Sequence, residues 1–112
     1  MSNITQGQFD YYSKEAMDAC ALAVLPEESM FWAGYLRGLR FALTGESFGN
    51  AEEKRLWTFI SGDVYREARR KGYRAGCSGM SVKNVKLTVQ MEEWKIETSR
   101  RLKLGITEKE PD

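Results

Sequence analysis

Two five-residue stretches of the chain share one pattern: Gly34-Tyr35-Leu36-Arg37-Gly38 and Gly72-Tyr73-Arg74-Ala75-Gly76. Each reads G-Y-x-x-G, and each falls in a segment whose apolar periodicity predicts a helix. Glycines four positions apart lie on one face of a helix, where the missing Cβ lets a second backbone come close. We therefore expect these glycines to mark a close crossing of two helices. The alternative is chance, because the chain contains ten glycines in 112 residues.

Apolar periodicity around the two stretches predicts a mainly α fold, a compact small helical domain of three to five helices. Residues 7–24 are typical of a first helix and residues 26–44 of a second. Pro26 suits the first turn of the second helix, and Gly45 is a suitable stop after its end. The second helix is apolar over a wide arc, which indicates a central position in the core.

The rest of the chain leaves two choices open. After residue 50 we expect a third helix and then a fourth over roughly 62–76, with Ser61 as its candidate cap, although one long helix is an alternative. Within residues 82–97 apolar side chains alternate with polar ones, which is typical of a C-terminal strand or β-hairpin, but a helix buried on both sides is an equally open alternative. We expect a single helical domain over residues 1–104 and a frayed C-terminal tail over residues 105–112.

The composition excludes several kinds of catalytic site. The chain has two cysteines and no histidine. It therefore cannot form a Ser-His-Asp or Cys-His nucleophile, and it cannot complete a four-ligand zinc site of nitrogen and sulfur atoms on its own. The stretch Gly45 to Gly49 matches the G-x-S-x-G nucleophile elbow, but that motif needs a preceding strand and a histidine, so we interpret it as a loop between helices. We expect a non-enzymatic protein without metal or cofactor, and a reactive Cys77 would be the simplest contrary sign.

The ends of the chain and its hydropathy predict a compartment. Residues 1–10 lack the basic and apolar regions of a signal peptide. No uncharged run approaches the roughly 20 residues that span a bilayer. We therefore expect a cytoplasmic protein that has no membrane partner.

Charge is distributed unevenly along the chain. Residues 1–63 carry 9 acidic and 5 basic side chains (net −4), whereas residues 64–112 carry 7 acidic and 12 basic side chains (net +5). Within residues 64–86, arginines recur four positions apart and form one ridge if the segment is helical. The candidate partner-binding residues are Arg66, Arg69, Arg70, Lys71, Tyr73, Arg74, Lys83 and Lys86.

An arginine ridge beside an aromatic ring suits three situations. It can contact an acidic protein surface, it can contact the phosphates and bases of nucleic acid, or it can be a solvated face that complements the helix dipole. The overall net charge of +1 favours a protein partner over nucleic acid. The opposite charges of the two halves also permit head-to-tail self-association. We predict a small binding protein that occludes or bridges a protein partner, with a nucleic-acid-associated module that uses residues 64–86 as the alternative.

One helix end carries a resemblance to known proteins. The basic stretch from Arg69 to Gly76 resembles the helix ends of small phage- and prophage-encoded accessory proteins. The resemblance implies a small, stoichiometric, non-enzymatic protein that binds a host complex. It assigns a role to none of the residues in the stretch.

Overall fold

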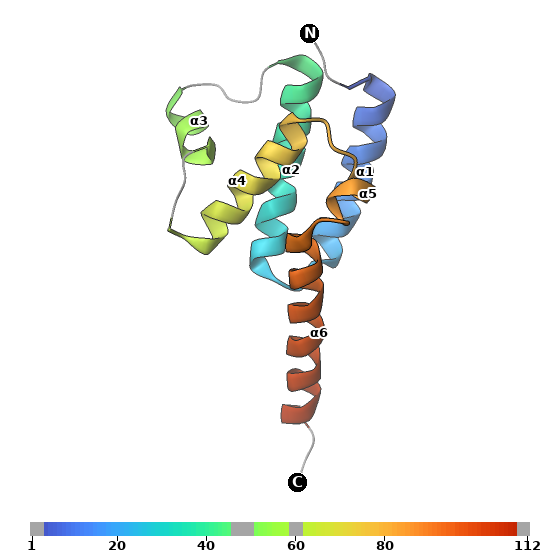
Figure 1. The fold of residues 1–112 in the computed structure, drawn as a ribbon, viewed down its shortest axis with the longest axis vertical. Helices are drawn as coiled ribbons and strands as arrows, with labels where there is room; N and C mark the ends of the chain where they lie inside the picture. Colours follow the sequence, from blue (N-terminus) through green and yellow to red (C-terminus); the bar gives the residue numbers. More distant parts are fainter. Residues whose placement is uncertain (1–3, 46–50, 59–61, 110–112) are drawn as a thin grey trace.

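The computed structural model describes residues 4–45, 51–58 and 62–109 of the chain. Within these ranges the regular elements are all helices: α1 (Gln6–Leu22), α2 (Pro26–Thr44), α3 (Ala51–Thr58), α4 (Val64–Cys77), α5 (Val82–Val85) and α6 (Val89–Lys109). The predicted mainly α fold is therefore confirmed. In Figure 1 the helices α1, α2 and α4 form a body, and α6 extends away from it.

Local sequence sets the ends of α2 and α4. Pro26 occupies the first turn of α2, and Gly45 follows its last residue with a φ of 81°, a left-handed conformation that favours glycine. The carboxylate of Asp63 caps α4, because it accepts hydrogen bonds from the backbone N–H groups of Tyr65 and Arg66 at 2.9 and 3.0 Å. The prediction of two separate helices is confirmed, whereas Ser61, the expected cap, lies outside the described residues.

The helices α2 and α4 cross at the four glycines of the two G-Y-x-x-G stretches. A Cβ on Gly34 or on Gly72 would lie closer than 3.0 Å to a backbone carbonyl of the opposite helix, a separation that real Cβ atoms essentially never show. The same holds for Gly38 and Gly76. At each of these glycines the missing side chain leaves room for the backbone of the other helix. The predicted close crossing is therefore confirmed.

The aromatic side chains of α2 form the centre of the core. Trp32 packs edge-on against Phe31 and Tyr35, with ring centroids 5.3 and 5.4 Å apart. Tyr35 is completely buried, and its hydroxyl donates a hydrogen bond of 2.5 Å to the carbonyl O of Met80. Burial raises the pKa of the Tyr35 phenol. The central position predicted for this helix is confirmed, and the Tyr35 hydrogen bond joins it to the segment that follows α4.

Residues 82–97 lie in α5, a turn and the first part of α6, so the structure shows the helical alternative and not the strand or β-hairpin. Ser81 caps a single helical turn by accepting a hydrogen bond from the backbone N–H of Asn84. Val85 is completely buried, whereas Leu87 is 74 % exposed, so these two side chains do not share a face as they would in a strand. The buried pair is instead Val82 and Val85, three positions apart on one face of a helical turn.

The last helix projects from the body (Figure 1). Its 21 residues give it a length of about 31 Å. The protein measures 60 × 31 × 21 Å, and its radius of gyration of 15.7 Å exceeds the value of about 13 Å typical of a compact domain of 100 residues. The helix continues to Lys109, within the segment expected to be a frayed tail, and residues 110–112 lie outside the described part.

Candidate binding surfaces

The predicted arginine ridge on α4 has exposed ends and a paired centre. Arg66 and Arg74 are exposed. Arg70 lies between them, but its side chain is only 13 % exposed and forms an ion pair with Glu67, to which its Nε donates at 2.8 Å. Tyr73 is buried, with 5 % of its surface exposed, so its ring face is not available for stacking on a nucleic-acid base. The ridge therefore presents two exposed charges rather than three.

Arg69 is engaged within the protein. Its guanidinium lies 4.2 Å from the ring centroid of Trp57 on α3, and the guanidinium of Arg37 lies 5.5 Å from the same ring. Burial, and to a smaller extent the charge of Arg66, lowers the pKa of Arg69. Sequence spacing gave no sign of this arrangement, because Trp57 comes from a different helix. It connects α3 to the two crossing helices.

Of the predicted lysines, Lys71 lies on α4 near Arg74, whereas Lys83 and Lys86 lie outside this helix. Lys71 is exposed and its Nζ donates a hydrogen bond of 3.2 Å to Oε1 of Gln90 on α6. Lys83 is exposed on α5, which packs against α1. Lys86 follows α5 and lines a groove on the body. The structure thus places Lys71 on the same helix as the arginines, but it does not join Lys83 and Lys86 to them.

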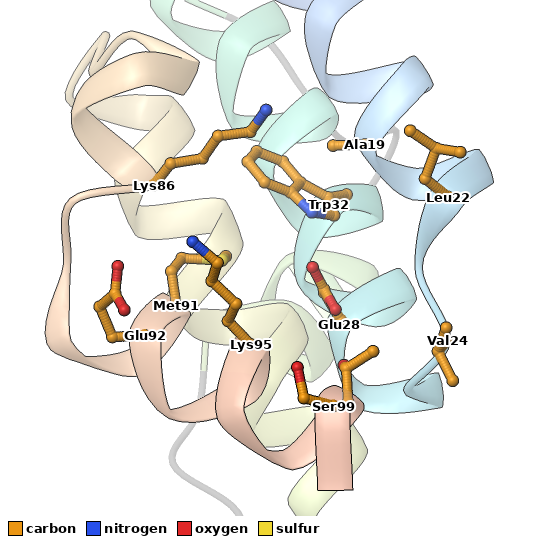
Figure 2. A pocket seen from close by; sticks show the side chains of 11 residues that line it. Ala19, Leu22, Val24, Glu28, Trp32, Lys86, Met91, Glu92, Lys95 and Ser99 are labelled. Atoms are coloured by element: carbon orange, nitrogen blue, oxygen red, sulfur yellow. The ribbon is translucent and has the colours of Figure 1, made fainter. Parts of the chain in front are cut away.

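A groove of about 360 Å³ lies between the end of α1, the start of α2 and the first half of α6. Figure 2 shows Trp32 in the middle of its lining, with apolar side chains on one side and lysines on the other. The residues come from two stretches that are distant in sequence, 19–32 and 86–99, so no motif in the chain signals them. Those with a polar or charged side-chain group are Glu28, Trp32, Lys86, Glu92, Lys95, Thr98 and Ser99.

The groove contains buried polar groups without a partner. The indole Nε1 of Trp32 and the hydroxyl Oγ1 of Thr98 are both buried and make no hydrogen bond of normal geometry. Burial raises the pKa of the Glu28 carboxyl, and the nearby indole N–H of Trp32 and the charge of Lys86 only partly oppose that rise. Such unsatisfied groups are uncommon in protein interiors, so the groove is a candidate ligand site.

One face of α6 continues beyond the body. Residues at positions 91, 94, 98 and 102 lie on one side of a helix, because successive residues turn by about 100°. Met91 is 7 % exposed, and Trp94 and Thr98 are half-buried against the body. Leu102 occupies the same side one turn further on and is 53 % exposed. Ile96, on a different side of the helix, is 67 % exposed.

Possible catalytic groups are few in the described residues. No group of three or more acidic, cysteine or histidine side chains that could hold a metal occurs in residues 4–45, 51–58 and 62–109. The serine of the G-x-S-x-G stretch lies outside those ranges. Cys77 ends α4 half-buried rather than exposed in a loop, and burial raises the pKa of its thiol, which lowers the fraction of reactive thiolate.

The chain matches no model of a known protein family, no curated protein and no solved structure. No helix in the described part of the chain combines the length and apolar character needed to cross a bilayer.

Proposed function

We propose that the chain is a non-enzymatic protein-binding module, and that the part of α6 around Leu102 forms its main contact surface. The observation that carries this proposal is the continuation of the body-facing side of α6. Met91 on that side is covered by the body, whereas Leu102 on the same side is 53 % exposed. A partner that covers Leu102 would extend the core of the protein along the helix.

The energetics of a projecting helix support this proposal. A helix without tertiary packing is only marginally stable in water at this length. Within α6, Glu97 forms ion pairs with Arg100 and Arg101, at 2.6 and 3.0 Å, and these hydrogen bonds lower the pKa of Glu97 to about 2. Exposed pairs of this kind contribute little stability. A partner would supply the apolar contact that the projecting end lacks.

The exposed cations of α4 supply a second contact surface in this proposal. Arg66 and Arg74 are on a different element from α6, so the module could bridge two acidic or amphipathic partners or occlude one large partner. In line with the resemblance to phage accessory proteins, the proposed partner is a host protein complex in the cytoplasm. The nucleic-acid alternative has less support, because Tyr73 is buried and Arg70 is paired with Glu67.

Replacing Leu102 by aspartate should abolish partner binding. A charge at this position cannot be buried against an apolar partner surface without a large desolvation penalty, so we expect affinity to fall at least about 100-fold. The partner is captured from the native host cell with the immobilised wild-type protein and identified by mass spectrometry. Its affinity for wild type and variant is then measured with the purified partner by titration calorimetry.

Ile96→Asp is the matched control, because it places the same charge on the same helix but on a different side. We expect this variant to bind the partner within about threefold of wild type, since an exposed substitution outside the contact is close to neutral. Circular dichroism must show equal helix content in both variants. Equal loss of binding for Ile96→Asp and Leu102→Asp, or loss for neither, would contradict the proposed contact surface.

The double variant Arg66→Glu/Arg74→Glu tests the α4 surface. We expect it to bind the same partner about tenfold more weakly and to reduce the salt dependence of binding, because two attractive charges become repulsive. The wild-type protein should leave the electrophoretic mobility of short DNA and RNA unchanged at low salt. A mobility shift that the double variant removes would favour the nucleic-acid alternative. If the double variant binds the partner with unchanged affinity, the arginine ridge is only a solvated face of the helix.

A further inference from the structure

The groove between α1, α2 and α6 has an amphiphilic lining. One side is apolar and comes from the end of α1 and the turn after it, with the side chains of Ala19, Leu22 and Val24. The other side belongs to the segment after α5 and to α6, where Lys86 and Lys95 extend their ammonium groups (Figure 2). Trp32 lies between the two sides. The groove therefore has an apolar side and a side on which the two lysines lie together with Met91 and Glu92.

Two buried polar atoms lie in the lining. Trp32 is only 1 % exposed, and its Nε1 lies beside the Glu28 carboxyl without a hydrogen bond of normal geometry. The Oγ1 of Thr98 is also buried without a hydrogen bond.

Acidic side chains restrict where an anion could lie. Glu28 extends from α2 below Trp32, on the side of the groove where Ser99 lies, and Glu92 lies at the outer edge beyond Lys95 (Figure 2). Both carboxylates would repel a negative charge placed next to them. The region near Lys86 and Lys95, beside the Trp32 ring, is the part of the groove suited to an anionic group.

We propose that this groove binds a small amphiphilic carboxylate, an organic anion with a short apolar chain. The carboxylate accepts hydrogen bonds from the ammonium groups of Lys86 and Lys95, and the chain lies across Trp32 against Leu22 and Val24. Charge-assisted hydrogen bonds of this type are the strong ones in proteins. The volume of about 360 Å³ lies in the range of small-ligand pockets. This site is separate from the proposed partner surface, because Leu102 does not line the groove.

Titration of the intact protein with octanoate tests this proposal. The three indole N–H signals in a ¹⁵N-correlated NMR spectrum are assigned with Trp→Phe variants. Octanoate should shift the Trp32 signal in a saturable manner and leave the Trp57 signal in place. Octanol and octylammonium, which keep the apolar chain but lack the negative charge, should bind at least about tenfold more weakly, since they lose the charge-assisted hydrogen bonds.

Two sets of variants distinguish recognition of the anion from nonspecific binding. Lys86→Gln/Lys95→Gln should weaken octanoate binding about tenfold or more, and Lys83→Gln, on an exposed lysine outside the groove, should leave it unchanged. The proposal is overturned if the Trp32 signal does not move at millimolar octanoate, or if octanol or the double lysine variant binds as well as octanoate binds wild type.

Discussion

Replacing Gly34 by alanine should destabilise the protein by about 3 kcal/mol or more, because the new methyl group would overlap the backbone of α4. A Cβ at Gly34 would lie closer than 3.0 Å to the carbonyl O and C of Arg69 and to the backbone N of Tyr73. Backbone atoms cannot turn aside as the end of a flexible side chain can. The two helices must therefore separate, and every contact along the crossing weakens with them. Domains of this size are typically stable by only about 5–15 kcal/mol, so the double variant Gly34→Ala/Gly72→Ala should not fold.

Gly7→Ala is the matched control for this prediction. Gly7 lies in the first turn of α1, and the nearest atom to a Cβ there is Oγ1 of Thr5 at 3.9 Å, an ordinary contact. The same chemical change should therefore stabilise the protein by up to about 1 kcal/mol, because alanine favours the helix and restricts the unfolded chain. Urea unfolding followed by circular dichroism measures both variants. A loss of stability at Gly34 no larger than about 1 kcal/mol would mean that the crossing is loose enough to adapt.

The parts of the fold that were predictable have local causes. Pro26 and Gly45 act on the backbone next to them, so the ends of α2 could be predicted from the sequence. The G-Y-x-x-G glycines predict a close crossing because their spacing places them on one helix face, although the pattern alone does not say which helices cross. The second helix was predicted to be central because its apolar residues cover a wide arc, and the buried aromatic side chains confirm this position.

The parts that were not predictable depend on contacts between distant segments. The alternation that favours a strand near Val85 is overridden because the cap at Ser81 starts a helical turn that buries Val82 with Val85. The ridge loses its central charge because Arg70 pairs with Glu67, and the spacing of the arginines does not show this. The groove draws its lining from α1, α2, α6 and the segment after α5, so no local pattern contains it.

Replacing Trp94 by alanine should release α6 from the body while the crossed helices stay folded. The Trp94 ring packs edge-on against Phe31, with centroids 5.4 Å apart and an angle of 76° between the rings. Loss of this half-buried ring should cost about 2–4 kcal/mol, because it removes both apolar burial and the aromatic contact. Of the contacts that remain, the buried Met91 holds only the first turn of α6. The hydrogen bond from Lys71 to Gln90 and the 3.8 Å ion pair from Arg101 to Glu27 are weak. We therefore expect a loss of helical signal at 222 nm and rapid amide exchange along α6, with slow exchange retained in α2 and α4.

The consequence for binding follows from the cost of ordering the helix. If α6 is released, a partner must fold and dock it before Leu102 can be covered, so affinity should fall although the contact surface is unchanged. Ile96→Ala is the control, because Ile96 is 67 % exposed on a different side of α6 and its truncation should change stability by less than about 0.5 kcal/mol. If Trp94→Ala unfolds the whole protein in one transition, α6 and the body form a single cooperative unit. If α6 amides stay protected in this variant, Trp94 is not the residue that holds the helix in place.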